Sequence, residues 1–158
     1  MKVNKESATL KKEAIKIGLC EEWTKEWGSE STESLCKKMI RGIDFCLKHN
    51  YPSLKHLKKW KGISDEFGIF TDASERIEAT LDAYVFNGKS NIIVNVGEYG
   101  CTRLYIRHDC TVEVNIHPTA VVMIDLYDNA VIKVNGDCKV FKYGGYVVGE
   151  CKVVNKYK

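Results

Sequence analysis

The chain has 158 residues and a formal net charge of +3, with 44% hydrophobic and 28% charged residues. This composition is typical of a folded protein with one ordinary domain or two small ones, and it excludes a disordered chain. No apolar run approaches the ~20 residues of a membrane span, and the first residues lack the apolar core of a signal peptide, so we expect no membrane partner.

The charge is distributed unevenly along the chain. Residues 1–61 carry 14 Lys or Arg against 8 Asp or Glu, whereas residues 62–158 carry 10 against 13. A basic first part and a mildly acidic second part predict two structural units. We expect a basic helical region over residues 1–62 and a repeat domain over residues 63–158.

The basic region begins with short helical patterns. Residues 5–19 have the composition and apolar spacing of a helix. Trp23 and Trp27 then lie four residues apart, on one side of a short helix, and we interpret them as core residues that pack on the next helix.

The strongest helix is predicted over residues 32–49, where apolar residues recur at helical spacing. Ser31 or Thr32 is expected to cap its start, and Asn50 to close its end. A shorter helix from Leu54 to Trp60 follows, with Ser53 as its cap.

A lead-in to a β region follows the helices. The predicted features are a short strand at residues 68–70 and a strand over residues 75–85 whose odd positions are apolar. Asn87-Gly88 is a tight-turn signal of the kind that joins hairpin strands.

From Ile92 to Val140 the even-numbered positions are apolar or small, and turn residues interrupt this alternation about every ten positions. In each ten-residue segment a small residue, such as Cys110, Ala120 or Ala130, precedes the alternating apolar residues. This order is the same in every segment, whereas antiparallel strands would reverse it from one strand to the next. We therefore predict an α+β fold in which N-terminal helices precede a short β-solenoid, with lead-in and C-terminal cap strands. An antiparallel β-meander or sandwich is the alternative.

Two ten-residue sides per coil would give twenty residues per turn. Residues twenty apart would then stack, so Asn95, Asn115 and Asn135 are expected to form an outward ladder. Glu113 would lie beside Lys133 as a neighbour of opposite charge. After a loop at residues 143–146, residues 147–154 are expected to form a last strand.

The reactive side chains form no recognisable catalytic motif. The seven cysteines are odd in number and no pair is spaced as C-x-x-C, so we interpret them as reduced, mostly buried thiols. Cys110 lies near His108 and Asp109, but its position in the inward column favours a packing role. His108, Asp109, His117 and Asp128 lie at turns without the spacing of a metal site. We therefore assign no catalytic residue, metal or cofactor.

One segment mixes basic and aromatic residues. Lys55, Lys58, Lys59, Trp60 and Lys61 form a candidate interaction surface for nucleic acid or an acidic partner. The simpler interpretation is the solvated face of a short helix.

Four stretches of the sequence are similar to segments of other proteins. They are Arg41–Ser53, Lys61-Gly62, Gly68–Phe70 and Leu126–Val131. These stretches resemble small uncharacterised proteins of gut bacteria and their phages, and the similarity covers most of the chain. The resemblance implies no activity and no functional residue. The β part also looks loosely like bactofilins and pentapeptide-repeat proteins, but its period differs from theirs and from the six-residue repeat of left-handed-helix acyltransferases.

These observations favour a non-enzymatic structural or interaction protein. We hypothesise a self-associating scaffold, or an assembly component of a phage or mobile element, that acts in the cytoplasm or as a virion component in a bacterial host. A protein partner or self-association is expected. The alternative is a module that binds nucleic acid or an acidic partner through the basic helical region.

Overall fold

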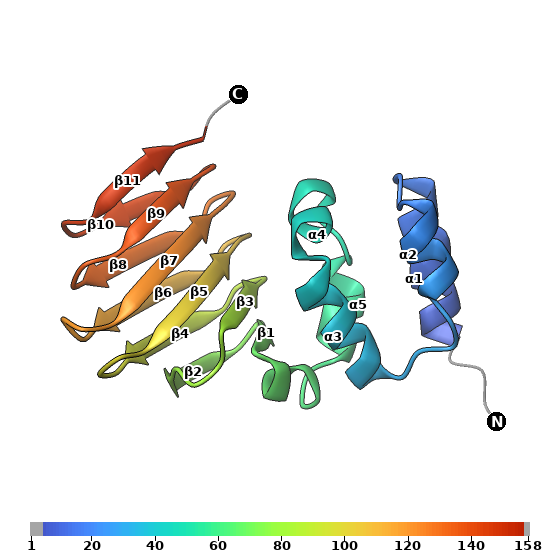
Figure 1. Cartoon of the computed structure of the whole chain (residues 1–158), viewed down its shortest axis with the longest axis horizontal. Helices are drawn as coiled ribbons and strands as arrows, with labels where there is room; N and C mark the ends of the chain where they lie inside the picture. Colours follow the sequence, from blue (N-terminus) through green and yellow to red (C-terminus); the bar gives the residue numbers. More distant parts are fainter. Residues whose placement is uncertain (1–4, 157–158) are drawn as a thin grey trace. The chain divides into compact units, whose positions relative to one another are not determined.

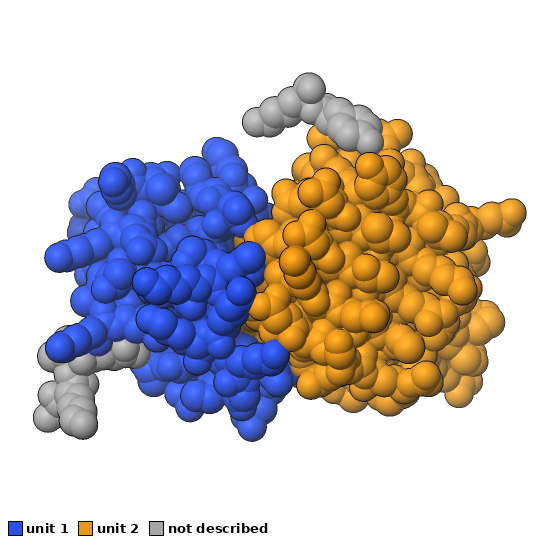
Figure 2. Space-filling model, turned by 180° about the vertical axis from the view of Figure 1, so that it is seen from behind, with its two compact units in different colours: residues 1–67 blue, residues 68–158 orange. Residues whose placement is uncertain are grey.

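The structure is a computed structural model that describes residues 5–156. The chain divides into two compact units, one ending at Phe67 and the other beginning at Gly68 (Figure 2). The boundary lies a few residues later than the sequence suggests, because Ser64–Phe67 forms a 3-10 helix that contacts the third helix of the first unit.

The first unit is helical (Figure 1). Its buried side chains include Leu10, Leu35, Leu57 and Trp60. The α-helices are α1 (Lys5–Lys16), α2 (Glu21–Glu26), α3 (Thr32–Arg41), α4 (Ile43–His49) and α5 (Leu54–Lys59).

The helix expected over residues 32–49 is in fact two helices, because the chain breaks at Gly42. Glycine is a poor helix former, and here it also allows a close approach. A Cβ at Gly42 would lie 3.3 Å from the carbonyl oxygen of Lys38 and 3.4 Å from the ring of Trp23. The two ends are as predicted: Ser31 Oγ accepts a hydrogen bond from the Ser34 N–H at 3.2 Å, and Asn50 closes α4 in the left-handed conformation.

The second unit is a β-solenoid, and every strand pairing in it is parallel. This confirms the predicted fold and excludes the meander. Sheet A has the order β1-β3-β5-β7-β9-β11 and sheet B the order β10-β8-β6-β4-β2. The strands are β1 (Ile69–Thr71), β2 (Ser74–Glu78), β3 (Ala83–Asn87), β4 (Asn91–Val96), β5 (Cys101–Ile106), β6 (Thr111–Ile116), β7 (Val121–Leu126), β8 (Val131–Asn135), β9 (Lys139–Lys142), β10 (Tyr146–Val148) and β11 (Lys152–Asn155).

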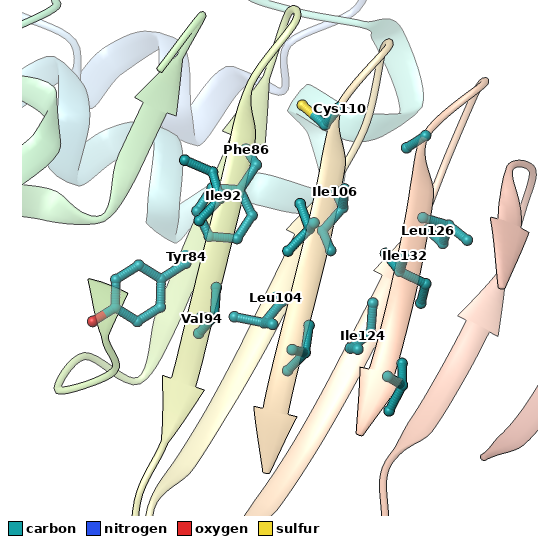
Figure 3. Packing of buried hydrophobic residues seen from close by; sticks show 14 of the residues in the cluster. Tyr84, Phe86, Ile92, Val94, Leu104, Ile106, Cys110, Ile124, Leu126 and Ile132 are labelled. Atoms are coloured by element: carbon teal, nitrogen blue, oxygen red, sulfur yellow. The ribbon is translucent and has the colours of Figure 1, made fainter. Parts of the chain in front are cut away.

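The central coils are twenty residues long, as the repeat predicts. Val94 pairs with Val114, and Val114 pairs with Val134. In these central coils, the even-numbered residues of both sheets point into one shared interior (Figure 3). Leu104, Val114 and Ile124 are completely buried there. Burial of each such side chain stabilises the fold by about 1.5–3 kcal/mol.

The first coil differs from the prediction. The segment expected as one strand over residues 75–85 forms two strands, β2 and β3, which belong to different sheets. In β3 it is Tyr84 and Phe86 that join the solenoid core, so even positions face inward there. The Asn87-Gly88 turn connects β3 of sheet A to β4 of sheet B, so it is a corner of the solenoid and not a hairpin turn.

The last coil also differs. The strand expected over residues 147–154 is divided into β10 and β11 by Gly149, whose φ is 114°. A Cβ at this glycine would lie 2.4 Å from the carbonyl oxygen of Val134, so the chain turns tightly against the coil below.

Candidate interaction surface

The two sheets present very different outer faces. On sheet B, Asn115 donates its amide to Asn95 Oδ1 at 2.9 Å, and Asn135 donates to Asn115 Oδ1 at 2.7 Å. Asn95 continues the ladder by donating to Glu78 Oε1 at 2.8 Å. The amides therefore satisfy one another, and the ladder reinforces the stack.

An opposite-charge pair lies beside this ladder. Lys133 Nζ is 3.9 Å from Glu113 Oε1, and both side chains are partly exposed. Such pairs contribute little stability. The outer face of sheet B thus carries a polar ladder and an ion pair whose groups are paired within the protein.

The outer face of sheet A is aromatic and basic. We call it the aromatic–basic face, and it is formed by outward side chains of β5, β7, β9 and β11 together with the residue that follows β11. Its members are Arg103, Tyr105, Met123, Asp125, Lys139, Phe141, Lys152, Val154 and Lys156.

Arg103, on β5, is held in place on this face. Its Nε donates to Asp125 Oδ2 at 2.7 Å and its second guanidinium nitrogen donates to Asp125 Oδ1 at 3.1 Å. The residue Asp125 is only 2% exposed. The guanidinium carbon also lies 5.5 Å from the ring centroids of both Tyr105 and Phe141. A two-pronged ion pair between two rings fixes the planar guanidinium in one orientation.

Two further cations lie near the ring of Phe141. Lys139 Nζ lies 5.0 Å and Lys156 Nζ 5.8 Å from its ring centroid. Next to this group, where β7 and β9 end, the rings of Tyr127 and Tyr143 stack at 4.6 Å with an angle of 4°. The surface therefore offers preorganised aromatic rings together with positive charge.

The charge of this face is one-sided. Among the outward residues of β5, β7, β9 and β11, Asp125 is the acidic one, and Arg103 neutralises it. Lys139 and Lys152 add positive charge to the same face. Aromatic residues and arginine are enriched at protein interfaces, and complementary charge steers a partner to them.

The basic segment of the helical unit lies on and after α5. Lys55, Lys58, Lys59 and Lys61 are exposed, as expected for a solvated helix face. Trp60 is different: it is 1% exposed, and its indole N–H donates to Glu6 Oε1 at 3.1 Å. The tryptophan therefore belongs to the helical core, so this segment has no exposed indole on which a base could stack.

The Cys110 region has the geometry of a structural corner. The Cys110 thiol is buried and donates to the carbonyl oxygen of Gly88 at 3.5 Å. Burial raises the pKa of this thiol to about 11, so it is protonated at neutral pH. His108 Nδ1 accepts the Gly88 N–H at 2.9 Å, so this nitrogen is engaged with the backbone.

The candidate metal ligands lie at two different corners. His108 and Asp128 occupy one corner, where Asp128 Oδ2 accepts the His108 N–H at 2.9 Å. His117 lies at the corner between β6 and β7 and contacts Thr119. Within residues 5–156, no group of three or more His, Cys, Asp or Glu side chains is arranged to hold a metal ion.

The aromatic–basic face was not recognised from the sequence. One outward column, in which Tyr105 and Asp125 alternate with the asparagines, was visible as a ten-residue pattern. A twenty-residue coil divides this column into two, one on each sheet. Placing Arg103 next to Asp125 also requires a diagonal contact across strands, which a repeat pattern does not show.

Comparison of the sequence with known protein families and curated proteins, and of the fold with solved structures, finds no match. Among the helices of residues 5–156, none is both long and apolar enough to span a bilayer.

Proposed function

We propose that this protein is a non-enzymatic interaction protein that binds an acidic protein surface on the aromatic–basic face of its solenoid. The observation that carries the proposal is the fixed guanidinium of Arg103 between two aromatic rings, on a face whose acidic residue is already neutralised. The strands that carry these residues are paired with neighbouring strands, and Arg103 is already held by Asp125, so binding would require little ordering of the surface.

The first test uses a defined acidic probe. Fluorescein-labelled poly-L-glutamate is titrated with the protein at low salt, and binding is followed by anisotropy. We expect the double variant Lys139→Glu/Lys152→Glu to weaken binding at least tenfold, because both lysines lie on the aromatic–basic face.

A matched variant controls for overall charge. Arg76→Glu/Lys89→Glu changes the net charge equally, but Arg76 lies on β2 of sheet B and Lys89 in an exposed corner. We expect this variant to bind within about twofold of the wild type, because its substitutions lie outside the aromatic–basic face. Equal losses in the two variants would show that general charge drives the binding, and would contradict the proposal.

The alternative hypothesis is binding of nucleic acid through Lys55, Lys58, Lys59 and Lys61. The same titration with a labelled RNA duplex and the variant Lys58→Glu/Lys59→Glu separates the two. Preferential binding of RNA, with a steep salt dependence that this variant removes, would favour the alternative.

Self-association remains a second proposal, and the end of the solenoid supports it. Tyr146 and Val148 on β10 are 65% and 54% exposed, and β10 pairs on one side with β8. An uncovered strand edge with apolar side chains favours pairing with another chain. Light scattering during size-exclusion chromatography tests this directly, because a strict monomer at high concentration would exclude a self-associating scaffold.

The cellular setting is part of the same proposal. All seven cysteines are free thiols, which supports a reducing compartment such as the cytoplasm of a bacterial host. A phage or mobile-element origin would agree with an assembly role, and mass spectrometry of purified virions would test it.

A further inference from the structure

The helical unit contains a cavity of about 330 Å³ that the interaction surface does not use. This volume is within the range of small-molecule sites. Its lining is predominantly apolar and includes all three tryptophans of the chain, together with Phe45 and Tyr51.

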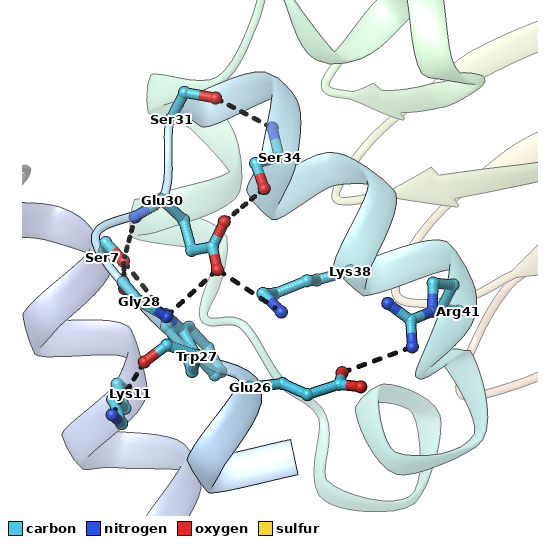
Figure 4. A network of polar contacts seen from close by, with 10 residues as sticks. All are labelled: Ser7, Lys11, Glu26, Trp27, Gly28, Glu30, Ser31, Ser34, Lys38 and Arg41. Carbon is cyan, nitrogen blue, oxygen red and sulfur yellow. Dashed lines mark hydrogen bonds and ion pairs between the residues drawn. The ribbon is translucent and has the colours of Figure 1, made fainter.

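The aromatic lining is held by hydrogen bonds. The Trp27 indole N–H donates to Ser7 Oγ at 3.0 Å, and Lys11 Nζ donates to the Trp27 carbonyl oxygen at 2.8 Å (Figure 4). The Tyr51 hydroxyl donates to the carbonyl oxygen of Leu10 at 2.8 Å. The cavity walls are therefore preorganised, and their rings come from α2, from α4 and from the segments that follow α2, α4 and α5.

Charged side chains line the same cavity. Lys38 and Arg41 are basic, and Asp44 is acidic. Lys38 Nζ lies 5.8 Å from the Trp23 ring centroid and 5.9 Å from that of Trp27. It is also 3.5 Å from Glu30 Oε1 (Figure 4). Lys38 is thus committed to the protein's own network.

Arg41 is the more available cation. Its guanidinium lies 4.9 Å over the Trp23 ring and makes one contact with Glu26 at 3.4 Å. The side chains of Arg41 and Glu26 are 61% and 55% exposed. A single-contact pair at the surface is weak, so a ligand carboxylate can replace Glu26.

We propose that this cavity binds a small aromatic carboxylic acid, with its ring among the tryptophans and its carboxylate on Arg41. The aromatic walls favour a flat ring through edge and face contacts. The guanidinium of Arg41 offers two parallel donors to a carboxylate. This site is separate from the aromatic–basic face and does not depend on the function proposed for it.

The test compares two probes of nearly equal shape. Naphthalene-1-acetate and its uncharged analogue naphthalene-1-acetamide are titrated into the full-length protein by calorimetry. We expect the acid to bind about tenfold more tightly than the amide, because only the acid makes a charged contact with Arg41.

Two variants locate the carboxylate. Arg41→Gln is expected to remove the tenfold preference, so that the acid and the amide bind with nearly equal affinity. Asp44→Asn is expected to strengthen the binding of the acid about twofold to threefold, because it removes the acidic side chain that lines the cavity. Both residues are exposed, so neither change removes a buried contact.

Cysteine alkylation reports where the probe binds. Cys20 lines the cavity and is exposed, whereas Cys101 is exposed on the solenoid and serves as the internal control. We expect naphthalene-1-acetate to slow the alkylation of Cys20 and leave that of Cys101 unchanged. Absence of binding at 1 mM, equal affinity for acid and amide, or equal protection of both cysteines would each overturn the proposal.

Discussion

One corner of the solenoid is built from residues in the left-handed conformation. Gly88, His108 and Asp128 are twenty residues apart and have φ values of 70°, 58° and 57°. Glycine adopts this conformation without cost, and His and Asp tolerate it better than most residues. The strain is compensated locally, because His108 Nδ1 accepts the Gly88 N–H and Asp128 Oδ2 accepts the His108 N–H.

This corner predicts a pH dependence of stability. The pKa of His108 is lowered from its usual 6.5, first by burial and next by Arg107, while Asp128, Asp109 and Asp72 act in the opposite direction. A His with a lowered pKa binds fewer protons in the folded state, so stability is complete above pH 6.5 and decreases as the pH falls below it. Urea unfolding between pH 5 and pH 8 should show this decrease.

The variant His108→Asn tests the assignment. Asn tolerates the left-handed conformation and keeps an acceptor, but it does not titrate in this range. We expect a smaller loss of stability between pH 8 and pH 5 than in the wild type. His117→Asn, at the exposed corner between β6 and β7, is the matched control. An unchanged slope in His108→Asn would contradict the role assigned to this side chain.

The ion pair of the aromatic–basic face makes a second prediction at the residue scale. Asp125→Asn removes the charge that Arg103 holds through two hydrogen bonds. Because Asp125 is buried, we expect a loss of about 2 kcal/mol in the free energy of unfolding. Glu113→Gln removes the charge of a partly exposed pair at 3.9 Å and keeps the oxygen that accepts from Asn135, so it should cost less than about 0.5 kcal/mol. Similar losses in the two variants would refute the argument.

At the scale of the elements, the repeat was predictable wherever the coil length is constant. Val94, Val114 and Val134 were assigned to one column from the sequence, and they pair in the structure. The prediction failed where the length changes. Ile77 pairs with Val94, seventeen residues later, and this odd interval moves the inward residues of β2 to odd positions. Ala83 and Val85 of β3 are also apolar at odd positions although they do not join the solenoid core, so the alternation pattern merged β2 with β3.

The prediction failed at the C-terminal end for the same reason, because the last coils become shorter. Met123 pairs with Lys139 after sixteen residues, and Lys139 pairs with Lys152 after thirteen. A contracting coil has no fixed period, so β10 and β11 were merged in the prediction. In the helical unit, the contact between Trp23 and Gly42 depends on tertiary packing, so the division of α3 from α4 and the cavity beside it were not visible in the sequence.

The coil as the repeating unit predicts the outcome of deletions. Removal of residues 111–130 deletes one whole coil, so β8 can pair with β4 and β9 with β5 in the native register. We expect this variant to keep a strand-rich circular dichroism spectrum and a cooperative thermal transition.

Removal of residues 111–120 deletes only half a coil. Inward parity is kept, but every strand after β5 would move to the opposite sheet, so Asn135 would leave sheet B and the asparagine ladder would be broken. The larger deletion instead places Asn135 next to Asn95 and preserves the ladder. We therefore expect the smaller deletion to lower the melting temperature more than the larger one. A higher melting temperature for the ten-residue deletion would contradict the twenty-residue unit.

At the scale of the whole molecule, the stability of the solenoid should vary along its axis. Coils of a repeat protein interact mainly with their neighbours, so a terminal coil has half the contacts of a central one. Strand β11 pairs with β9 and strand β10 pairs with β8, each on one side, and both strands are short. Their side chains are also more exposed than those of β5 to β7.

The rate of native-state hydrogen exchange should therefore increase from the central strands of the solenoid to its C-terminal end. We expect the slowest exchange for backbone amides of β5, β6 and β7, which have a paired strand on both sides, and the fastest for β10 and β11. Ile124→Ala should accelerate the central strands most, because this side chain is completely buried and its loss costs about 2–5 kcal/mol. Uniform protection along the solenoid, or faster exchange in β6 than in β11, would show that the coils unfold as one block and would refute the gradient.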